Sequence, residues 1–253
     1  PEVIESYVNQ FNREDNELYK QDIPNCGASD FLRKNIPFFE CPDKELEKTY
    51  YFRWWTYRKH IKKTPDGFVI TEFLPDVPWA GKYNTISCAA NHHFYEGRWL
   101  RNAEILSDYA SFWFSGSGSP RLYSFGAADA IYNYYLIHND KMLLADLYPK
   151  LKDNFAKWEE EKKIDLSVLE GKREVFMVQL IEEDGAEKLV IVGTETIATL
   201  YGLYYISENI GVSPWVYWAD VVPAPKKEIV FDKSICTVSK EPSVRYRGFF
   251  MND

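Results

Sequence analysis

The chain has 253 residues and a formal net charge of −8, and 45% of its residues are hydrophobic and 17% aromatic. Its Lys and Arg residues are dispersed, so it lacks the basic stripe of a nucleic-acid-binding protein. No apolar run approaches the roughly 18 residues that cross a bilayer. The length admits two domains or one large domain, and the surplus of rings suits core packing or sugar stacking.

The start of the chain and its cysteines give two further expectations. It opens at Pro1, without an initiator Met or a signal-peptide core, so we expect a chain trimmed or excised from a longer one. No C-x-x-C spacing occurs, so the cysteines suggest neither a zinc ribbon nor a dense disulfide framework. We expect no metal and no cofactor. The four cysteines are widely separated: Cys26, Cys41, Cys88 and Cys236.

The first part of the chain shows helical periodicity. Apolar residues recur at three- and four-residue intervals from 43 to about 61, around 106–113, over 125–136 and over 141–160. Asp140 is placed to cap the last of these helices. Between the first two, residues 67–74 are β-branched and aromatic and follow Pro65-Asp66-Gly67, which predicts a short strand.

The pattern changes after the charge run at 159–163, which predicts a domain boundary near 163. Residues 174–182 and 188–193 are typical of strands joined by a hairpin turn. Thr194 can cap a following helix, and Gly211 suits its C-terminus. Strands are also expected at 228–231 and 244–250. The predicted fold class is therefore α plus α/β, with a helical region at 1–163 and an α/β domain at 164–253.

Five ordered motifs mark the C-terminal part: VIVG at 190–193, YGLY at 201–204, GVSPW at 211–215, WADV at 218–221 and PSVRYRG at 242–248. Together they resemble glycoside hydrolase family 115, the bacterial xylan α-1,2-glucuronidases. The resemblance implies an α/β domain leading into a TIM-type barrel, with 244–250 as the first barrel strand. It also implies removal of (4-O-methyl)glucuronic acid from xylan, and it favours a periplasmic or secreted location.

This resemblance suggests four substrate-binding residues. Asn252 and Asp253 would follow the first barrel strand, at the end where such barrels place their sites; alternatively they are a solvated chain terminus. Trp215 and Trp218 would stack on a sugar ring, or else anchor their loop against the barrel.

The N-terminal part carries FFECPD at 38–43, YFRWW at 51–55, HHFYEGRWL at 92–100 and YSF at 123–125. These motifs resemble the (α/α) toroid glycosidases of the mannosylglycerate-hydrolase-like group, and the chain would hold part of such a toroid. The resemblance implies a sugar cleft to which His92, His93 and Arg98 contribute. The chain departs from the pattern at Asn102, where an Asp is expected, and at Gly126, where an aromatic residue is expected.

Hydrolysis of a glycosidic bond requires two carboxyl groups, one acting as acid and the other as base or nucleophile. Glu96 is one candidate, and its alternatives are a sugar ligand or an ion-pair partner of Arg98. Asp129 is the second candidate, with helix packing or capping as its alternative. His92 and His93 would point about 100° apart on a helix, which disfavours joint binding of one metal.

Two functional hypotheses follow. In the first, the chain is part of a glycoside hydrolase that acts on plant polysaccharide. In the second, it is a non-catalytic carbohydrate-binding or assembly module. The expected partner is an oligo- or polysaccharide in either case, and surfaces that lack their usual neighbours would favour a homo-oligomer or the remainder of a parent chain.

Overall fold

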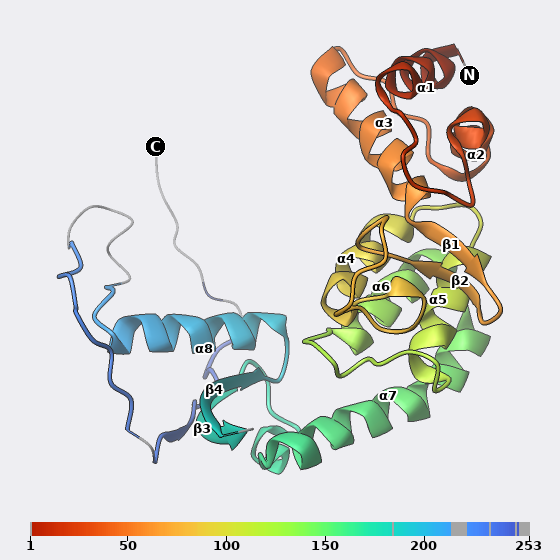
Figure 1. The fold of residues 1–253 in the computed structure, drawn as a ribbon. Helices are drawn as coiled ribbons and strands as arrows, with labels where there is room; N and C mark the ends of the chain where they lie inside the picture. Colours follow the sequence, from red (N-terminus) through yellow and green to blue (C-terminus); the bar gives the residue numbers. More distant parts are fainter. Residues whose placement is uncertain (1, 184, 214–221, 233, 246, 248–253) are drawn as a thin grey trace. The chain divides into compact units, whose positions relative to one another are not determined.

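The structure, a computed structural model, describes residues 2–183, 185–213, 222–232, 234–245 and 247. The chain forms two compact units, residues 1–155 and 156–253. Helices and two small antiparallel sheets make up the described residues (Figure 1), which confirms the predicted class of α plus α/β.

The first unit opens with three helices, α1 (Glu2–Glu14), α2 (Ala28–Asn35) and α3 (Lys44–Lys59). The amphipathic helix α1 buries Ile4, Val8 and Phe11 at helical spacing. The predicted helix from 43 is α3, and its N-cap is Asp43, whose carboxylate accepts from the backbone N–H groups of Glu45 and Leu46. Helices α1 and α2 were not predicted from the sequence.

A hairpin of two strands follows α3: β1 (Ile61–Thr64) and β2 (Gly67–Ile70). The predicted helix extended to about Ile61, which is wrong, because Ile61 begins β1 and pairs with Ile70. Gly67 makes the turn between the strands with φ of +94°, a conformation that favours glycine. The predicted strand at 67–74 is confirmed only as far as Ile70.

Four helices complete the unit: α4 (Ser87–Gly97), α5 (Glu104–Phe114), α6 (Ala127–His138) and α7 (Lys141–Lys162). The last three confirm the predicted helices. Asp140 caps α7 as predicted, since the N–H of Leu143 donates to its carboxylate over 2.9 Å. The last third of α7, from residue 156, belongs to the other unit.

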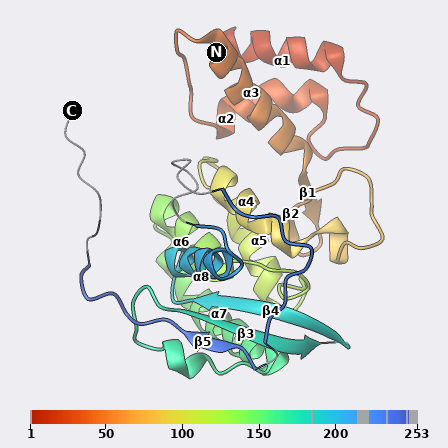
Figure 2. The same ribbon diagram turned by 90° about the vertical axis from the view of Figure 1, so that its left-hand side faces the viewer.

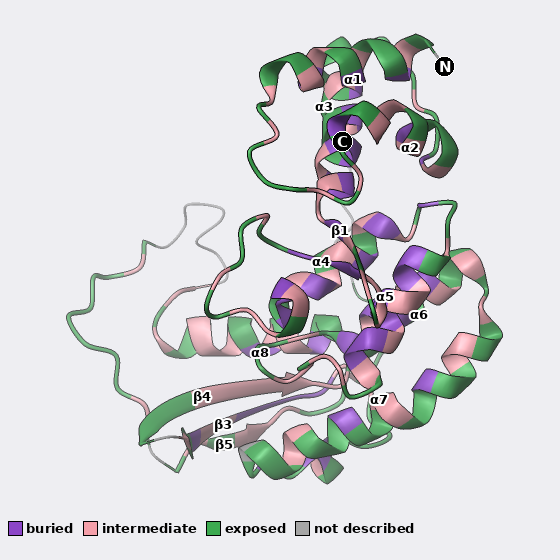
Figure 3. Cartoon of the chain, turned by 45° about the vertical axis from the view of Figure 1, so that its right-hand side comes forward, coloured by how far each residue is buried: buried purple, intermediate pink, exposed green. Residues whose placement is uncertain are grey.

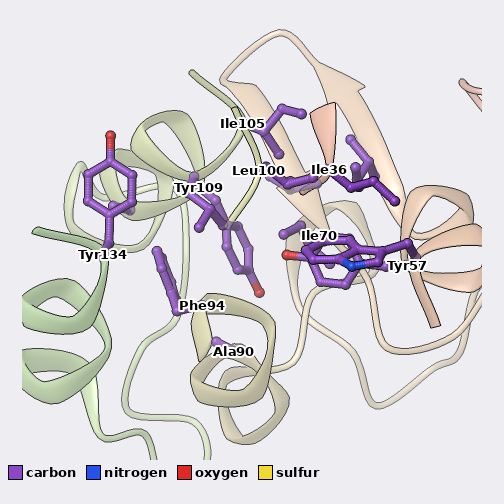
Figure 4. Packing of buried hydrophobic residues seen from close by; sticks show 14 of the residues in the cluster. Ile36, Tyr57, Ile70, Ala90, Phe94, Leu100, Ile105, Tyr109 and Tyr134 are labelled. Atoms are coloured by element: carbon purple, nitrogen blue, oxygen red, sulfur yellow. The ribbon is translucent and has the colours of Figure 1, made fainter. Parts of the chain in front are cut away.

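An aromatic core lies where α3, α4, α5 and α6 meet. Figure 4 shows Tyr57, Phe94 and Tyr109 among aliphatic side chains from the hairpin and from α5. The Phe94 and Tyr109 rings stack with their centroids 5.2 Å apart. Buried residues gather on the facing sides of α4, α5 and α6 (Figure 3). Each such ring contributes about 1.5–3 kcal/mol by leaving water.

The second unit contains β3 (Phe176–Glu183), β4 (Ala186–Gly193), α8 (Thr196–Asn209) and β5 (Cys236–Val238). The two strands and the helix predicted between 174 and 211 are confirmed. The strands form one antiparallel sheet in the order β4-β3-β5, and α8 packs on it (Figure 2). Ala198 and Gly202 bring α8 close to the sheet, where a Cβ at Gly202 would lie 2.4 Å from Ile191.

Three details of this unit differ from prediction. Residues 228–231 form no strand; instead, β5 pairs with β3. Thr194 is not the N-cap of α8, because its hydroxyl accepts from the N–H of Val175 and Glu195 occupies the cap position. Of the expected barrel strand at 244–250, residues 244, 245 and 247 are irregular, and the others lie outside the described residues. Gly211 follows α8 with φ of +95°, as predicted.

Replacing Gly97 with Ala should destabilise the protein by about 1–3 kcal/mol, because the added Cβ would lie 2.0 Å from the Tyr57 hydroxyl oxygen. Gly27→Ala is the matched control, since its Cβ would meet no atom closer than 3.9 Å. Urea unfolding of the two variants measures the difference. Equal free energies of unfolding would show that α3 and α4 are not in this close contact.

Candidate functional site

Tyr95 on α4 and Arg98 directly after it contact side chains of α6. The Tyr95 hydroxyl donates to Asp129 Oδ2 over 2.5 Å, and Asn133 Nδ2 donates to Asp129 Oδ1 over 3.2 Å. Asn133 Nδ2 also lies 3.1 Å from the Tyr95 hydroxyl, and Arg98 donates to Asn133 Oδ1. We call these four residues, Tyr95, Arg98, Asp129 and Asn133, the α4–α6 network.

Asp129 is held through both carboxylate oxygens. It lies in the first turn of α6, where the helix dipole favours a negative charge. Its hydrogen bond raises the pKa of Tyr95, because the phenol proton is donated to a carboxylate. The Tyr95 side chain is 38% exposed, so the network lies at the surface, where a ligand can reach it.

Arg98 has donor capacity to spare. Its guanidinium lies over the rings of Tyr95 and Trp99, 5.1 and 5.2 Å from their centroids. Its Nε is buried and has no hydrogen-bond partner, and no carboxylate of the described residues forms an ion pair with it. His138 Nε2 donates to the Arg98 carbonyl oxygen over 2.8 Å and fixes the backbone there. A carboxylate or several hydroxyl groups would complete this site.

Glu96 contacts α3 and not α6. Its two carboxylate oxygens accept from Arg53 on α3, from Nε over 3.1 Å and from Nη2 over 2.6 Å. The expected alternative of a Glu96–Arg98 pair is therefore wrong. Successive residues of a helix point about 100° apart, so Tyr95 reaches Asp129 while Glu96 reaches Arg53. The two catalytic candidates are thus engaged by different partners.

The two histidines differ in environment. His92 is exposed, whereas His93 Nδ1 lies 3.2 Å from the hydroxyl of the buried Tyr109. Burial lowers the pKa of His93 to about 3, so its imidazole is neutral at physiological pH. Its carbonyl oxygen accepts from the Tyr57 hydroxyl over 2.8 Å. His93 therefore joins α4 to the core, and only His92 is free to face a ligand.

The remaining expected site residues have different outcomes. Trp215, Trp218, Asn252 and Asp253 lie outside the described residues. Asn102, which stands where an Asp was expected, accepts from the N–H of Glu104 over 3.1 Å at the start of α5. Within the described ranges, no three His, Cys, Asp or Glu side chains are grouped so that they could hold a metal ion.

Sequence reasoning missed Tyr95 and Asn133 as site residues. Tyr95 lies inside the motif at 92–100, three residues after His92, and Asn133 follows Asp129 by four residues. Each therefore shares a helix face with a residue that was predicted for the site. The spacing could have identified Asn133. The contact between Tyr95 and Asn133, in contrast, depends on how α4 packs against α6.

Comparison with known proteins identifies the type of domain. The family model of the mannosylglycerate hydrolase MGH1-like glycoside hydrolase domain matches residues 82–168. A solved structure named a sialidase is 37% identical, with a TM-score of 0.60 over 67% of this chain and 17% of that one. This chain thus spans less than a fifth of that protein. No curated protein matches the chain.

The chain therefore contains a glycoside hydrolase-like region. This confirms the toroid-type resemblance of the N-terminal part at the level of a glycosidase-like domain; the comparisons do not extend to family 115. Across the described residues, no helix combines the length and apolar character needed to cross a membrane.

Replacing His93 with Gln should flatten the dependence of stability on pH. The folded pKa of His93 is about 3, against an ordinary value near 6.5, so the unfolded chain takes up a proton first as the pH falls. Its contribution to stability is full above pH 6.5 and is lost progressively toward pH 3. The free energy of unfolding of the wild type should therefore fall more steeply between pH 6.5 and 4 than that of the variant.

His92→Gln is the control for this measurement: burial is the main cause of the low pKa of His93 and the neighbouring His92 a lesser one, so this variant should change the slope much less than His93→Gln does. Other titrating groups are common to all three proteins and cancel in the comparison. Parallel curves for the wild type and His93→Gln would contradict the burial of the His93 imidazole.

Proposed function

We propose that the chain is part of a glycoside hydrolase that acts on a saccharide with a carboxylated sugar, and that the intact protein removes (4-O-methyl)glucuronic acid from xylan. One observation carries the proposal. The glycosidase family match at residues 82–168 includes every member of the α4–α6 network.

The chemistry of the network supports an acidic sugar. Asp129 can accept from sugar hydroxyls, and the exposed rings of Tyr95 and Trp99 offer flat apolar faces for the C–H side of a pyranose. Arg98 has no carboxylate partner among the described residues and suits the carboxylate of a uronic acid. The named neighbour is a sialidase, and sialic acid also carries a carboxylate.

In this proposal residues 1–163 are part of a toroid and residues 164–253 are the domain that leads into a barrel. The C-terminal motifs that resemble α-glucuronidases support the second assignment. Trp215, Trp218, Asn252 and Asp253 would contribute further contacts to the sugar. Asp129 is the carboxylate that we assign to catalysis, and its counterpart is a carboxylate other than Glu96, since Glu96 is paired with Arg53.

A non-catalytic carbohydrate-binding or assembly module is the second candidate. A specific observation favours it, because both Glu96 and Asp129 are engaged in contacts that join helices. In that case Tyr95, Trp99 and Arg98 would bind the sugar without cleaving it.

Incubation of the purified chain with glucuronoxylan separates the two candidates. We expect free uronic acid, measured by anion-exchange chromatography, and we expect Asp129→Asn to lower its release on the order of 100-fold. Asp146→Asn is the control, because Asp146 pairs with the exposed Lys150 on α7 and should leave release unchanged. Binding of glucuronoxylan without release would contradict catalysis and support the binding module. Absence of both would contradict both candidates.

A further inference from the structure

The first unit contains a pocket of about 380 Å³ that shares no residue with the α4–α6 network. Three segments line it: a strap at 19–22, the junction of α3 and β1 at 59–62, and the loop that follows β2, at 71–76. Asn84 lies against that loop. The volume is within the range of about 300–1,000 Å³ that is common for small-molecule sites.

The strap wall is fixed by a buried arginine. Arg58 is fully buried, and its Nη1 donates to Gln21 Oε1 over 2.8 Å and to the carbonyl oxygen of Ile23 over 2.5 Å. The carboxylate of Asp22 accepts from the N–H of Lys63 on β1 over 2.5 Å. The strap is thereby attached to both α3 and the hairpin.

Asn84 fixes the opposite wall. Its Oδ1 accepts from the N–H of Val77 over 3.0 Å, and its Nδ2 donates to the carbonyl oxygens of Phe73 and Pro75, each over 2.9 Å. Asn84 adopts φ of +66°, which is uncommon for a residue with a side chain. The three hydrogen bonds hold the loop in one conformation, so both walls of the pocket are preformed.

The floor of the pocket contains one buried side-chain atom that has no hydrogen-bond partner among the described residues. His60 Nδ1 is buried without a partner, so its hydrogen-bonding capacity is unused. The neighbouring Thr71 is 5% exposed, and its N–H donates to the His60 carbonyl oxygen. Burial lowers the pKa of His60, so its imidazole is neutral and suits a hydroxyl group.

The rim of the pocket carries two accessible lysines, Lys20 and Lys62, and two carboxylates, Asp22 and Asp76. Lys20 is exposed, and Lys62 has a side chain 43% exposed whose Nζ is 4.0 Å from Asp76, a loose pair. Lys59 is not available, because it is 8% exposed and lies 2.7 Å from Asp15. Tyr19 and Leu74 add apolar surface beside these charges. Hydroxyl partners on the floor and lysines at the rim fit a small polyhydroxylated anion.

We propose that this pocket binds one carboxylated monosaccharide unit, with its hydroxyls toward His60 and Thr71 and its carboxylate toward Lys20 and Lys62. The choice of an acidic sugar rests on the proposed function. The pocket would be a second saccharide site beside the α4–α6 network. It would hold a neighbouring part of a polysaccharide or a released sugar.

Titration of the full chain with D-glucuronate, followed by two-dimensional amide NMR, tests the proposal. We expect saturable shifts at residues that line the pocket, and weaker binding of D-glucose, which has the same ring without the carboxylate. Lys62→Gln should weaken binding of glucuronate about tenfold and leave that of glucose nearly unchanged. Lys34→Gln, a change of an exposed lysine on α2, should alter neither.

The outcomes are distinct. Shifts that do not saturate, or equal affinities for the two sugars, would overturn the assignment, as would retained affinity in Lys62→Gln. Asp129→Asn should leave the shifts in the pocket intact, because the two sites share no residue. Binding of glucuronate without release of uronic acid from glucuronoxylan would support the proposed pocket and contradict catalysis by this chain. Release of uronic acid without binding of glucuronate in the pocket would support catalysis and contradict the proposed pocket.

Discussion

The contact of Tyr57 with α4 determines how that helix is oriented. The Tyr57 hydroxyl donates to the His93 carbonyl oxygen and occupies the space where a side chain at Gly97 would be. With this side of α4 held against α3, Glu96 reaches Arg53, and Tyr95 reaches Asp129 on α6. The positions of the polar groups in the candidate site thus depend on Gly97 and on the buried phenol of Tyr57, neither of which is part of the α4–α6 network.

Local patterns predicted much of the fold. Helices α5, α6 and α7, the hairpin β3–β4 and the cap Asp140 follow from periodicity and capping chemistry. Helix α1 shows the same periodicity, with Ile4, Val8 and Phe11 on its buried face. In contrast, β1 and β5 are three or four residues long, and their strand character comes from pairing with partners elsewhere in the chain, which a single sequence does not reveal.

The candidate site was predicted only in part. The motif at 92–100 and Asp129 were identified, but their partners were not, because periodicity gives the faces of a helix and not the neighbour that each face meets. Glu96 was thereby given a wrong alternative partner, Arg98. The pocket beside β1 was not anticipated either, because residues from 19 to 84 converge on it only in the folded chain.

The central claim is that Tyr95, Arg98 and Asp129 contact an acidic saccharide. The most direct measurement is amide and side-chain NMR of the full chain during titration with an aldobiouronic acid, a xylose that carries one glucuronic acid. We predict saturable shifts of the Arg98 guanidinium signals and of the Tyr95 and Asp129 amides. Saturable binding that leaves these three residues unshifted, or an absence of binding, would contradict it.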